Sequence, residues 1–400
     1  MLALVAIAAL VGHVDASKVR GFSNEEQKSV RHLMGGKMSS SSDVNASSER
    51  SSIVSSASSS GGSSKSGKSD KGKGKGKDSK QYQDEKCRGT VVVANQGDAS
   101  ISILDAIDGE LIDTIYLPYN ENTQEMPVPV DIVAVNGVIY VGDKANDRVI
   151  AIDAISYNII RSIGAGSGVG EMAADSRGTQ LWVNNVNDNT TTVIDLAYLV
   201  PIRTVEASSD AGNGVVNDVI LSPSGDAAFI THAGDGGAII KYDTRDGSQL
   251  EVNRDIGDNA MVSSSYRFNC LYIPSASTDT VRVLFNGDLF QETSFNVTDP
   301  YDAAVSQDGK YVYISSTSQN SISIVDIGSN ELLTIVVKTE IAAPQKMATT
   351  SNRLFVQHKG SDYISIYSVT TTDPMPVYLG KQMVGMDPFG MAYCEPTRVC

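Results

Sequence analysis

Short runs of alternating apolar and polar residues recur along most of this chain. A run such as Val91 to Ala94 is followed by a polar hairpin with Gly-Asp or Asn-Asp, and then by a second run such as Ile101 to Leu104. Alternation with a period of two predicts β-strands, and the polar residues between the runs favour tight hairpins. A third run of the LIDTIYL kind follows, and a fourth with small residues, such as DIVAV or DAAVS, precedes the next repeat. Each unit is therefore predicted to be a four-stranded sheet.

The unit occurs seven times, at a spacing of 41 to 48 residues. The second runs of the seven units end at Asp105, Asp153, Asp195, Asp243, Phe285, Asp326 and Ser368. A β-rich repeat of about this length is typical of propeller blades, which have four strands each. The sequence thus predicts an all-β fold, a seven-bladed β-propeller with four-stranded blades.

The two ends of the repeat region are out of phase, which predicts how the ring closes. Cys87 enters at the second strand of blade one, whereas DPFGMAYCEP, residues 387–396, matches the innermost-strand segment TDPYDAAVSQD. The C-terminal segment is therefore expected to supply the innermost strand of blade one. The same alignment brings Cys87 and Cys394 within two residues of each other across a tight turn. That placement favours a disulfide between them in a secreted protein, with Cys400 as the competing partner.

The composition divides the chain into three segments. Residues 1–16 are apolar and end in small residues at Val14 and Ala16, which indicates a signal peptide. Residues 17–86 form a Ser-, Gly- and Lys-rich arm that has almost nothing apolar to bury and is expected to be disordered. Residues 87–400 form the propeller. No later segment approaches the roughly 20 apolar residues of a transmembrane helix. We therefore expect a secreted, extracellular or cell-wall protein with a monomeric propeller.

The charge differs between the arm and the propeller. Residues 1–86 contain 14 Lys and Arg against 9 Asp and Glu, a net charge of +5, so residues 87–400 carry −20 of the total of −15. An acidic propeller repels the phosphates of nucleic acids, so we expect no nucleic-acid partner. The basic arm favours contact with an anionic matrix or wall.

The strings VVVANQGDASISILDAIDGEL and VYISSTSQNSISIVDIGSNEL resemble the YVTN family of propeller repeats. The resemblance covers residues 88–394, and blades five and seven depart from it at Phe285 and Ser368. It implies the fold and leaves the activity open, because similar repeats occur in surface-layer proteins, lactonase-like enzymes and propeller subunits of redox enzymes.

One set of polar residues is predicted to converge at the mouth of the central channel, where the innermost strands begin. In the order of the blades around the ring, these positions are Asp131, Glu171, Asp218, Met261, Asp302, Lys346 and Gly390. Four carboxylates on one axis repel one another, so they need a cation, a bound base or raised pKa values. Oxygen ligands suit Ca²⁺ or Mg²⁺, which makes the four acidic residues candidate metal ligands. The alternative is a hydrated channel lining without a ligand.

Other acidic positions are better explained as turn residues. The hairpin acids are Asp98, Asp147, Asp188, Asp235, Asp279 and Asp362. Asp and Asn tolerate positive φ and bond to their own backbone, so these residues favour the turns themselves over calcium binding. The closing acids, such as Asp105, are expected to cap the next turn.

Three N-x-[ST] sequons begin at Asn45, Asn189 and Asn296. They would be glycan acceptors in a secreted eukaryotic protein, and Asn189 falls in a hairpin that is expected to be exposed.

The remaining motifs carry no catalytic signature. The glycine-rich segment 164–170 lacks the spacing of a phosphate-binding loop and is interpreted as a connection between blades. No HExxH, CxxC or GxSxG motif occurs, and only His232 and His358 lie in the propeller. Trp182 is expected in the core, and Cys270 is expected to be a buried thiol within a strand of blade five.

Two functions remain. The first is a secreted binding or scaffold module, in which the propeller holds a protein or polysaccharide partner and the arm tethers it to a matrix. The alternative is a lactonase-like hydrolase with a divalent cation at the channel mouth. In that case Asp131, Glu171, Asp218 and Asp302 would be ligands or bases, and Lys346 would polarise the carbonyl group.

Overall fold

The computed structural model describes residues 89–395 except for 235, 255, 259–260, 262, 266–269, 286, 291, 338–339 and 371. The predicted signal peptide and arm, together with Asn45, Cys87 and Cys400, lie outside the described residues.

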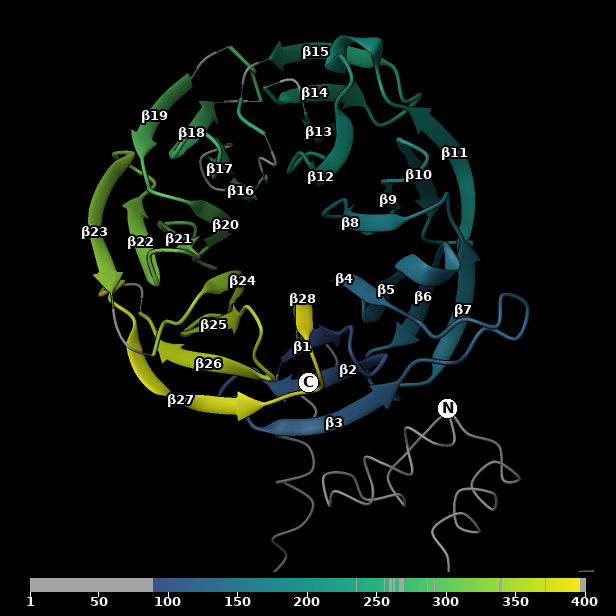
Figure 1. Ribbon diagram of the computed structural model, residues 1–400, viewed down its shortest axis with the longest axis horizontal. Helices are drawn as coiled ribbons and strands as arrows, with labels where there is room; N and C mark the ends of the chain where they lie inside the picture. The colour runs from purple at the N-terminus through teal and green to yellow at the C-terminus, as the bar shows by residue number, and fades with distance from the viewer. Residues whose placement is uncertain are drawn as a thin grey trace, which may run out of the picture. The chain divides into compact units, whose positions relative to one another are not determined.

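The described residues form seven antiparallel four-stranded sheets arranged as blades around a central axis, as predicted (Figure 1). The innermost strands of blades one to seven are β28 (Pro388–Cys394), β4 (Pro129–Val135), β8 (Val169–Ala174), β12 (Val215–Leu221), β16 (Ser263–Ser265), β20 (Pro300–Val305) and β24 (Pro344–Thr349). The second strands are β1 (Thr90–Asn95), β5 (Val138–Asp143), β9 (Gln180–Asn185), β13 (Ala227–Ala233), β17 (Cys270–Ser275), β21 (Tyr311–Ser316) and β25 (Arg353–His358).

The third strands are β2 (Ser100–Asp105), β6 (Arg148–Asp153), β10 (Thr190–Asp195), β14 (Ala238–Asp243), β18 (Thr280–Phe285), β22 (Ser321–Asp326) and β26 (Tyr363–Ser368). The outer strands are β3 (Leu111–Tyr116), β7 (Ile159–Gly164), β11 (Val200–Glu206), β15 (Gln249–Arg254), β19 (Glu292–Asn296), β23 (Glu331–Val337) and β27 (Val377–Met383). Two 3₁₀ helices, η1 (Lys144–Asn146) and η2 (Ser209–Ala211), complete the elements of the described residues. None of the helices in this part of the chain has the length and apolar character needed to cross a membrane.

The ring closes as the sequence predicts. Strand β28 pairs with β1, with Thr90 opposite Cys394, so the C-terminal strand is the innermost strand of blade one. The β-sheet of blade one therefore joins the two ends of the propeller.

The hydrophobic core lies between blades. In β1, Val92 and Ala94 pack into the cluster shared with blade two, whereas Val91 and Val93 pack into the cluster shared with blade seven. Seven such clusters lie among the described residues, and each joins two neighbouring blades. Because both faces of each strand are covered, each buried Val contributes about 1.5–3 kcal/mol. Trp182 is fully buried in one of these clusters, as predicted.

The hairpin acids do more than form turns. Asp147 has a φ of 50°, as expected of a turn residue, and its Oδ1 accepts a hydrogen bond of 2.7 Å from the backbone N–H of Gly168, which enters blade three. Four more hairpin side chains accept a backbone N–H of the next blade at Oδ1 in the same way. The pairs are Asn189 with Val216 (2.9 Å), Asp279 with Asp299 (2.7 Å), Asn320 with Ala343 (2.7 Å) and Asp362 with Asp387 (3.0 Å). These carboxylates and amides therefore lock neighbouring blades together.

The closing acids cap the following turns, as predicted. Asp105 Oδ1 accepts the N–H of Ile107 at 2.7 Å, and Asp195 Oδ1 accepts the N–H of Tyr198 at 2.9 Å. The glycine-rich segment is confirmed as a connection between blades, because β7 ends at Gly164 and β8 begins at Val169.

Candidate functional site

The innermost strands bring the five charged residues of the predicted ring together. We call them the channel cluster: Asp131 on β4, Glu171 on β8, Asp218 on β12, Asp302 on β20 and Lys346 on β24. All four carboxylates act on the ammonium group of Lys346 electrostatically, so they lie close enough to share its charge. The other two ring positions are not charged. A Cβ added at Gly390 would lie 2.8 Å from the Cα of Asp131, so only glycine fits there.

Lys346 and Glu171 form an ion pair across the channel. Lys346 Nζ donates a hydrogen bond of 3.0 Å to Glu171 Oε2, and the two side chains are 13% and 15% exposed. In Figure 1, β24 and β8 lie on different sides of the central axis, so the pair spans the channel from blade seven to blade three. The cation that the four carboxylates require is thus supplied by the chain itself.

Asp131 and Asp302 link neighbouring innermost strands. Asp131 Oδ2 accepts the backbone N–H of Met172 at 2.8 Å, and Asp302 Oδ2 accepts the backbone N–H of Met347 at 2.8 Å. Each carboxylate therefore has a structural role in addition to its charge. Asp218 Oδ1 accepts the N–H of Val219 at 2.8 Å within its own strand.

Burial dominates the electrostatics of the cluster. It raises the pKa of Asp131 well above its usual range, and the charge of Glu171 raises it further, against the opposing effects of Lys346 and the Met172 N–H. Burial also raises the pKa of Asp302, again against Lys346. For Lys346 burial alone would lower the pKa, but the carboxylates of Glu171, Asp218, Asp302 and Asp131 raise it well above its usual value. The lysine is therefore firmly positive, whereas Asp131 and Asp302 hold protons more tightly than ordinary carboxyl groups.

Sequence reasoning missed Tyr301, which neighbours the cluster. Burial raises the pKa of its phenol, and the charges of Lys346, Glu171, Asp302 and Asp218 all act on it. Its position directly before Asp302 was visible in the sequence, but strand alternation places adjacent side chains on opposite faces, so nothing in the pattern pointed to it.

The described residues contain no group of three or more His, Cys, Asp or Glu side chains arranged to hold a metal ion. The predicted Ca²⁺ or Mg²⁺ ligands are thus brought into one cluster without forming a preorganised metal site, and a metal ion would compete with Lys346 for them.

A cavity of about 610 Å³ lies at the other end of the innermost strands. Its walls carry the small residues predicted near the axis, including Ala134, Ala174, Ala304, Ala348 and Ala392. Met347 and Met391 also line it, and each follows a residue of the ring directly in sequence. The channel therefore has the charged cluster at one end and a cavity of mixed polar and apolar lining at the other.

The predicted modification sites have different outcomes. Cys394 is a buried thiol, and burial raises its pKa, while Cys87 lies outside the described residues, so the predicted disulfide remains untested. Cys270 is buried within β17, as predicted. Asn296, the last residue of β19, is exposed.

Asn189 differs from the expectation of a freely exposed acceptor. It is half-buried, its Nδ2 donates to the Gly214 carbonyl at 3.2 Å, and its Oδ1 accepts from Val216. A glycan on this nitrogen would disturb the lock between blades three and four.

Comparison with known proteins supports the propeller fold and gives a partial match to one family model. The sequence model of a family described as "Lactonase, 7-bladed beta-propeller" matches residues 278–389, which is about a quarter of the chain. No curated protein sequence matches this chain. These comparisons do not confirm the resemblance to YVTN repeats.

Several solved structures share the fold at low identity. A periplasmic gluconolactonase of Pseudomonas aeruginosa is 14% identical, with a TM-score of 0.61 over 76% of this chain and 99% of that chain. A Bacteroides uniformis protein provisionally named a 6-phosphogluconolactonase is 15% identical, with a TM-score of 0.63 over 77% and 99%. Hydrazine synthase of Kuenenia stuttgartiensis is 14% identical, with a TM-score of 0.57 over 70% and 94%. At these identities the likeness concerns the propeller fold alone.

Proposed function

We propose that this chain hydrolyses lactones at the channel cluster. The observation that carries the proposal is the buried Lys346 ammonium group, paired with Glu171 at 3.0 Å and surrounded by carboxyl groups with raised pKa values. The partial match to a lactonase family supports the same chemistry, and a gluconolactonase shares the propeller fold. This reverses the order of the two functions favoured by the sequence alone.

The residues of the cluster suit the steps of ring opening. A water molecule attacks the carbonyl carbon of the lactone, and the positive charge of Lys346 stabilises the oxyanion that forms. Asp131 or Asp302 takes the proton of the water, because a raised pKa makes a carboxylate a better base near neutral pH. The ring C–O bond then breaks, and the same carboxyl group returns the proton to the leaving alkoxide. The product is the open hydroxy acid.

The charge of the site selects among lactones. Four carboxylates and one ammonium group leave the channel mouth acidic, and the propeller as a whole is acidic. A negative potential repels anionic substrates. We therefore propose neutral lactones as substrates, in preference to phosphorylated ones.

The test is proton release from a panel of lactones, with δ-gluconolactone and γ-butyrolactone as neutral substrates and 6-phosphogluconolactone as the anionic one. We expect turnover of neutral lactones and a loss of at least about 100-fold in kcat for Lys346→Met, since one oxyanion-stabilising group is removed. Lys359→Met, which removes an exposed lysine of the same blade, is the control and should keep full activity. Hydrolysis that survives Lys346→Met, or no turnover of any lactone, would refute the proposal.

A second candidate function is the secreted binding or scaffold module. It is favoured by large apolar side chains that are exposed on the outer strands, among them Leu111, Ile112, Ile160, Leu333 and Leu379. Exposed apolar side chains mark contact with a partner where they gather into one patch. Cosedimentation with insoluble wall polysaccharide or matrix protein, with and without residues 17–86, tests it. Retention that depends on those residues supports the tether, and no retention in either form contradicts it.

A further inference from the structure

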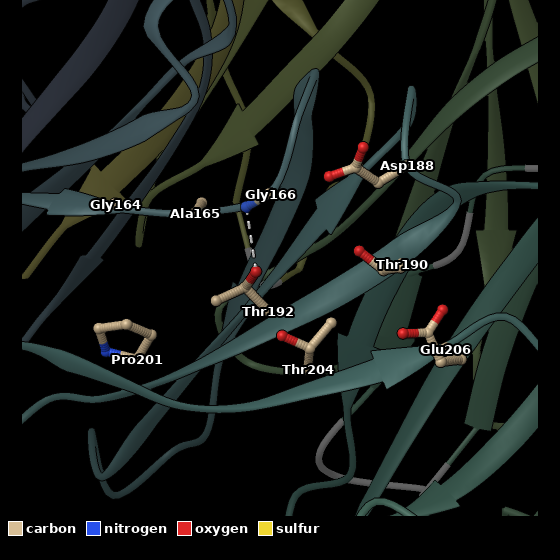
Figure 2. A pocket seen from close by; sticks show the side chains of 9 residues that line it. All are labelled: Gly164, Ala165, Gly166, Asp188, Thr190, Thr192, Pro201, Thr204 and Glu206. Atoms are coloured by element: carbon tan, nitrogen blue, oxygen red, sulfur yellow. Dashed lines mark hydrogen bonds between the residues drawn. The ribbon is translucent and has the colours of Figure 1, made fainter.

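A polar groove lies on blade three, away from the channel cluster. It has a volume of about 530 Å³ and is bounded by the connection from blade two and by the third and outer strands of blade three, β10 and β11 (Figure 2). The residues that line it are Gly164, Ala165, Gly166, Asp188, Thr190, Thr192, Pro201, Thr204 and Glu206. We call this the blade-three groove.

Two buried threonines present unused hydroxyl protons to the groove. Asn185 Nδ2 donates to both Thr190 Oγ1 and Thr192 Oγ1 at 2.9 Å, and the N–H of Gly166 also donates to Thr192 Oγ1 at 3.2 Å. Both threonines thus act as acceptors, yet they are only 7% and 4% exposed. Among the described residues no acceptor receives either hydroxyl proton. Such a donor needs an acceptor within the groove, and a ligand oxygen can replace the water that otherwise accepts it.

Acceptor oxygens lie in the same groove. Thr190 is directly opposite Glu206 in the pairing of β10 with β11, and Thr192 is opposite Thr204. The Glu206 carboxylate has no partner in the part of the chain that the structure describes. Asp188 accepts one bond of 2.6 Å at Oδ2 from the N–H of Ser167. Figure 2 shows Asp188 and Glu206 toward one end of the groove and Pro201 toward the other.

Blade one contains the same polar motif with a different residue opposite it. Asn95 Nδ2 donates to Ser100 and Ser102 at 3.0 Å, which corresponds to Asn185 with its two threonines. There the Ser100 hydroxyl donates to Asp98 Oδ1 at 2.7 Å, so its proton is used.

The residue opposite Ser100 is Tyr116, which takes the place of Glu206. Tyr116 is half-buried, and the charge of Asp98 acts on its phenol. Blade one therefore has an aromatic ring close to its acid where blade three has the exposed Glu206.

We propose that the blade-three groove binds a neutral polyhydroxylated ligand, a carbohydrate unit. Neighbouring sugar hydroxyls both donate and accept, which matches threonine protons beside carboxylate oxygens. A metal ion or an ammonium group would use Asp188 and Glu206 but leave the protons of Thr190 and Thr192 unmatched. An anionic ligand would be repelled by both carboxylates. The volume lies within the range of roughly 300–1,000 Å³ of small-molecule sites. The groove is separate from the channel cluster and does not depend on lactone hydrolysis.

The test is saturation-transfer NMR and calorimetry of the purified full chain with glucose, galactose, mannose, xylose and their neutral tetrasaccharides. We expect at least one of these sugars to bind. Glu206→Tyr introduces the residue that blade one has at this position, removes the carboxylate and places a ring at the groove, and should abolish binding. Thr204→Val should weaken it about tenfold, the equivalent of one lost hydrogen bond of about 1.4 kcal/mol. Thr114→Val, the same change at the matching position of blade one, should leave binding unchanged.

Three results would overturn the proposal. They are no binding by any of the sugars, sugar binding that persists in Glu206→Tyr, and calcium binding that requires Glu206 in place of sugar binding. A thermal melt of Glu206→Tyr checks that the blade remains folded, which is expected because the position is exposed on an outer strand. Lactone hydrolysis should not change in this variant, so failure of the groove and failure of the channel cluster are distinguishable.

Discussion

Lys346 Nζ lies 3.0 Å from Glu171 Oε2, although 175 residues separate them in the chain and their strands belong to blades seven and three. The pair is nearly buried, and three further carboxylates act on the same lysine. A buried ion pair of this kind adds little stability by itself, but removing one partner leaves an uncompensated charge. The predictions about the channel cluster follow from this asymmetry.

Lys346→Met should destabilise the propeller by about 3 kcal/mol at pH 8, because four carboxylates lose their shared cation. Glu171→Gln should cost less, since Lys346 keeps three carboxylate neighbours. Denaturant unfolding of both variants and the double variant gives the coupling energy. The loss in Lys346→Met should shrink as the pH falls, because protonated carboxyl groups no longer repel one another. A loss that does not vary with pH would contradict this account.

Calcium should affect the wild type and the Lys346→Met variant differently. In the wild type a divalent cation must compete with Lys346, so we expect little change in melting temperature on adding calcium to metal-stripped protein. In Lys346→Met the four carboxylates are open to the ion, and calcium should raise the melting temperature. Adding Asp131→Asn and Asp302→Asn to that variant should remove the effect. A strong calcium response of the wild type would instead support the metal site expected from the sequence.

The hydrogen bonds from hairpin side chains to the next blade, which we call blade locks, should depend on an acceptor oxygen and on the turn conformation. Asp147→Asn keeps both, so we expect a change below about 0.5 kcal/mol. Asp147→Ala loses the bond to Gly168 and places alanine at a φ of 50°, and should cost about 2 kcal/mol. Denaturant unfolding measures both, and equal effects of the two substitutions would show that the lock adds no stability.

His232 should make the propeller sensitive to acid. Its side chain is buried with neither ring nitrogen hydrogen-bonded within the described residues, and burial lowers its pKa to about 4. The unfolded chain takes up this proton at about pH 6.5, so stability is fully present above that pH and is lost as the pH falls toward 4. The contribution is about 3 kcal/mol in total.

The raised pKa values of Asp131 and Asp302 act in the opposite direction. Their folded forms take up protons before the unfolded chain does, so their burial cost falls with the pH. Comparing the wild type with His232→Gln between pH 4 and 7 isolates the histidine. If both proteins lose stability in parallel over this range, His232 does not contribute.

The architecture could be predicted from the sequence alone. Alternation of apolar residues, as in Val91 to Ala94, specifies strands buried on both faces, and sevenfold recurrence specifies the number of blades. It also specified the closure by the C-terminal strand and the meeting of five charged residues at the channel, because equivalent positions of equivalent blades converge on the axis. These properties are local or repeat at a fixed spacing, so a linear pattern can carry them.

The partners of individual side chains, in contrast, depend on how the ring packs in three dimensions. The pairing of Lys346 with Glu171, out of four available carboxylates, depends on the position of side chains across the channel. The use of Asn189 in a blade lock depends on the path of the next connection. The difference between blades one and three arises where Glu206 replaces Tyr116, and its effect depends on the space around both. Such contacts join residues of different blades at no fixed spacing, so packing of the whole ring determines them.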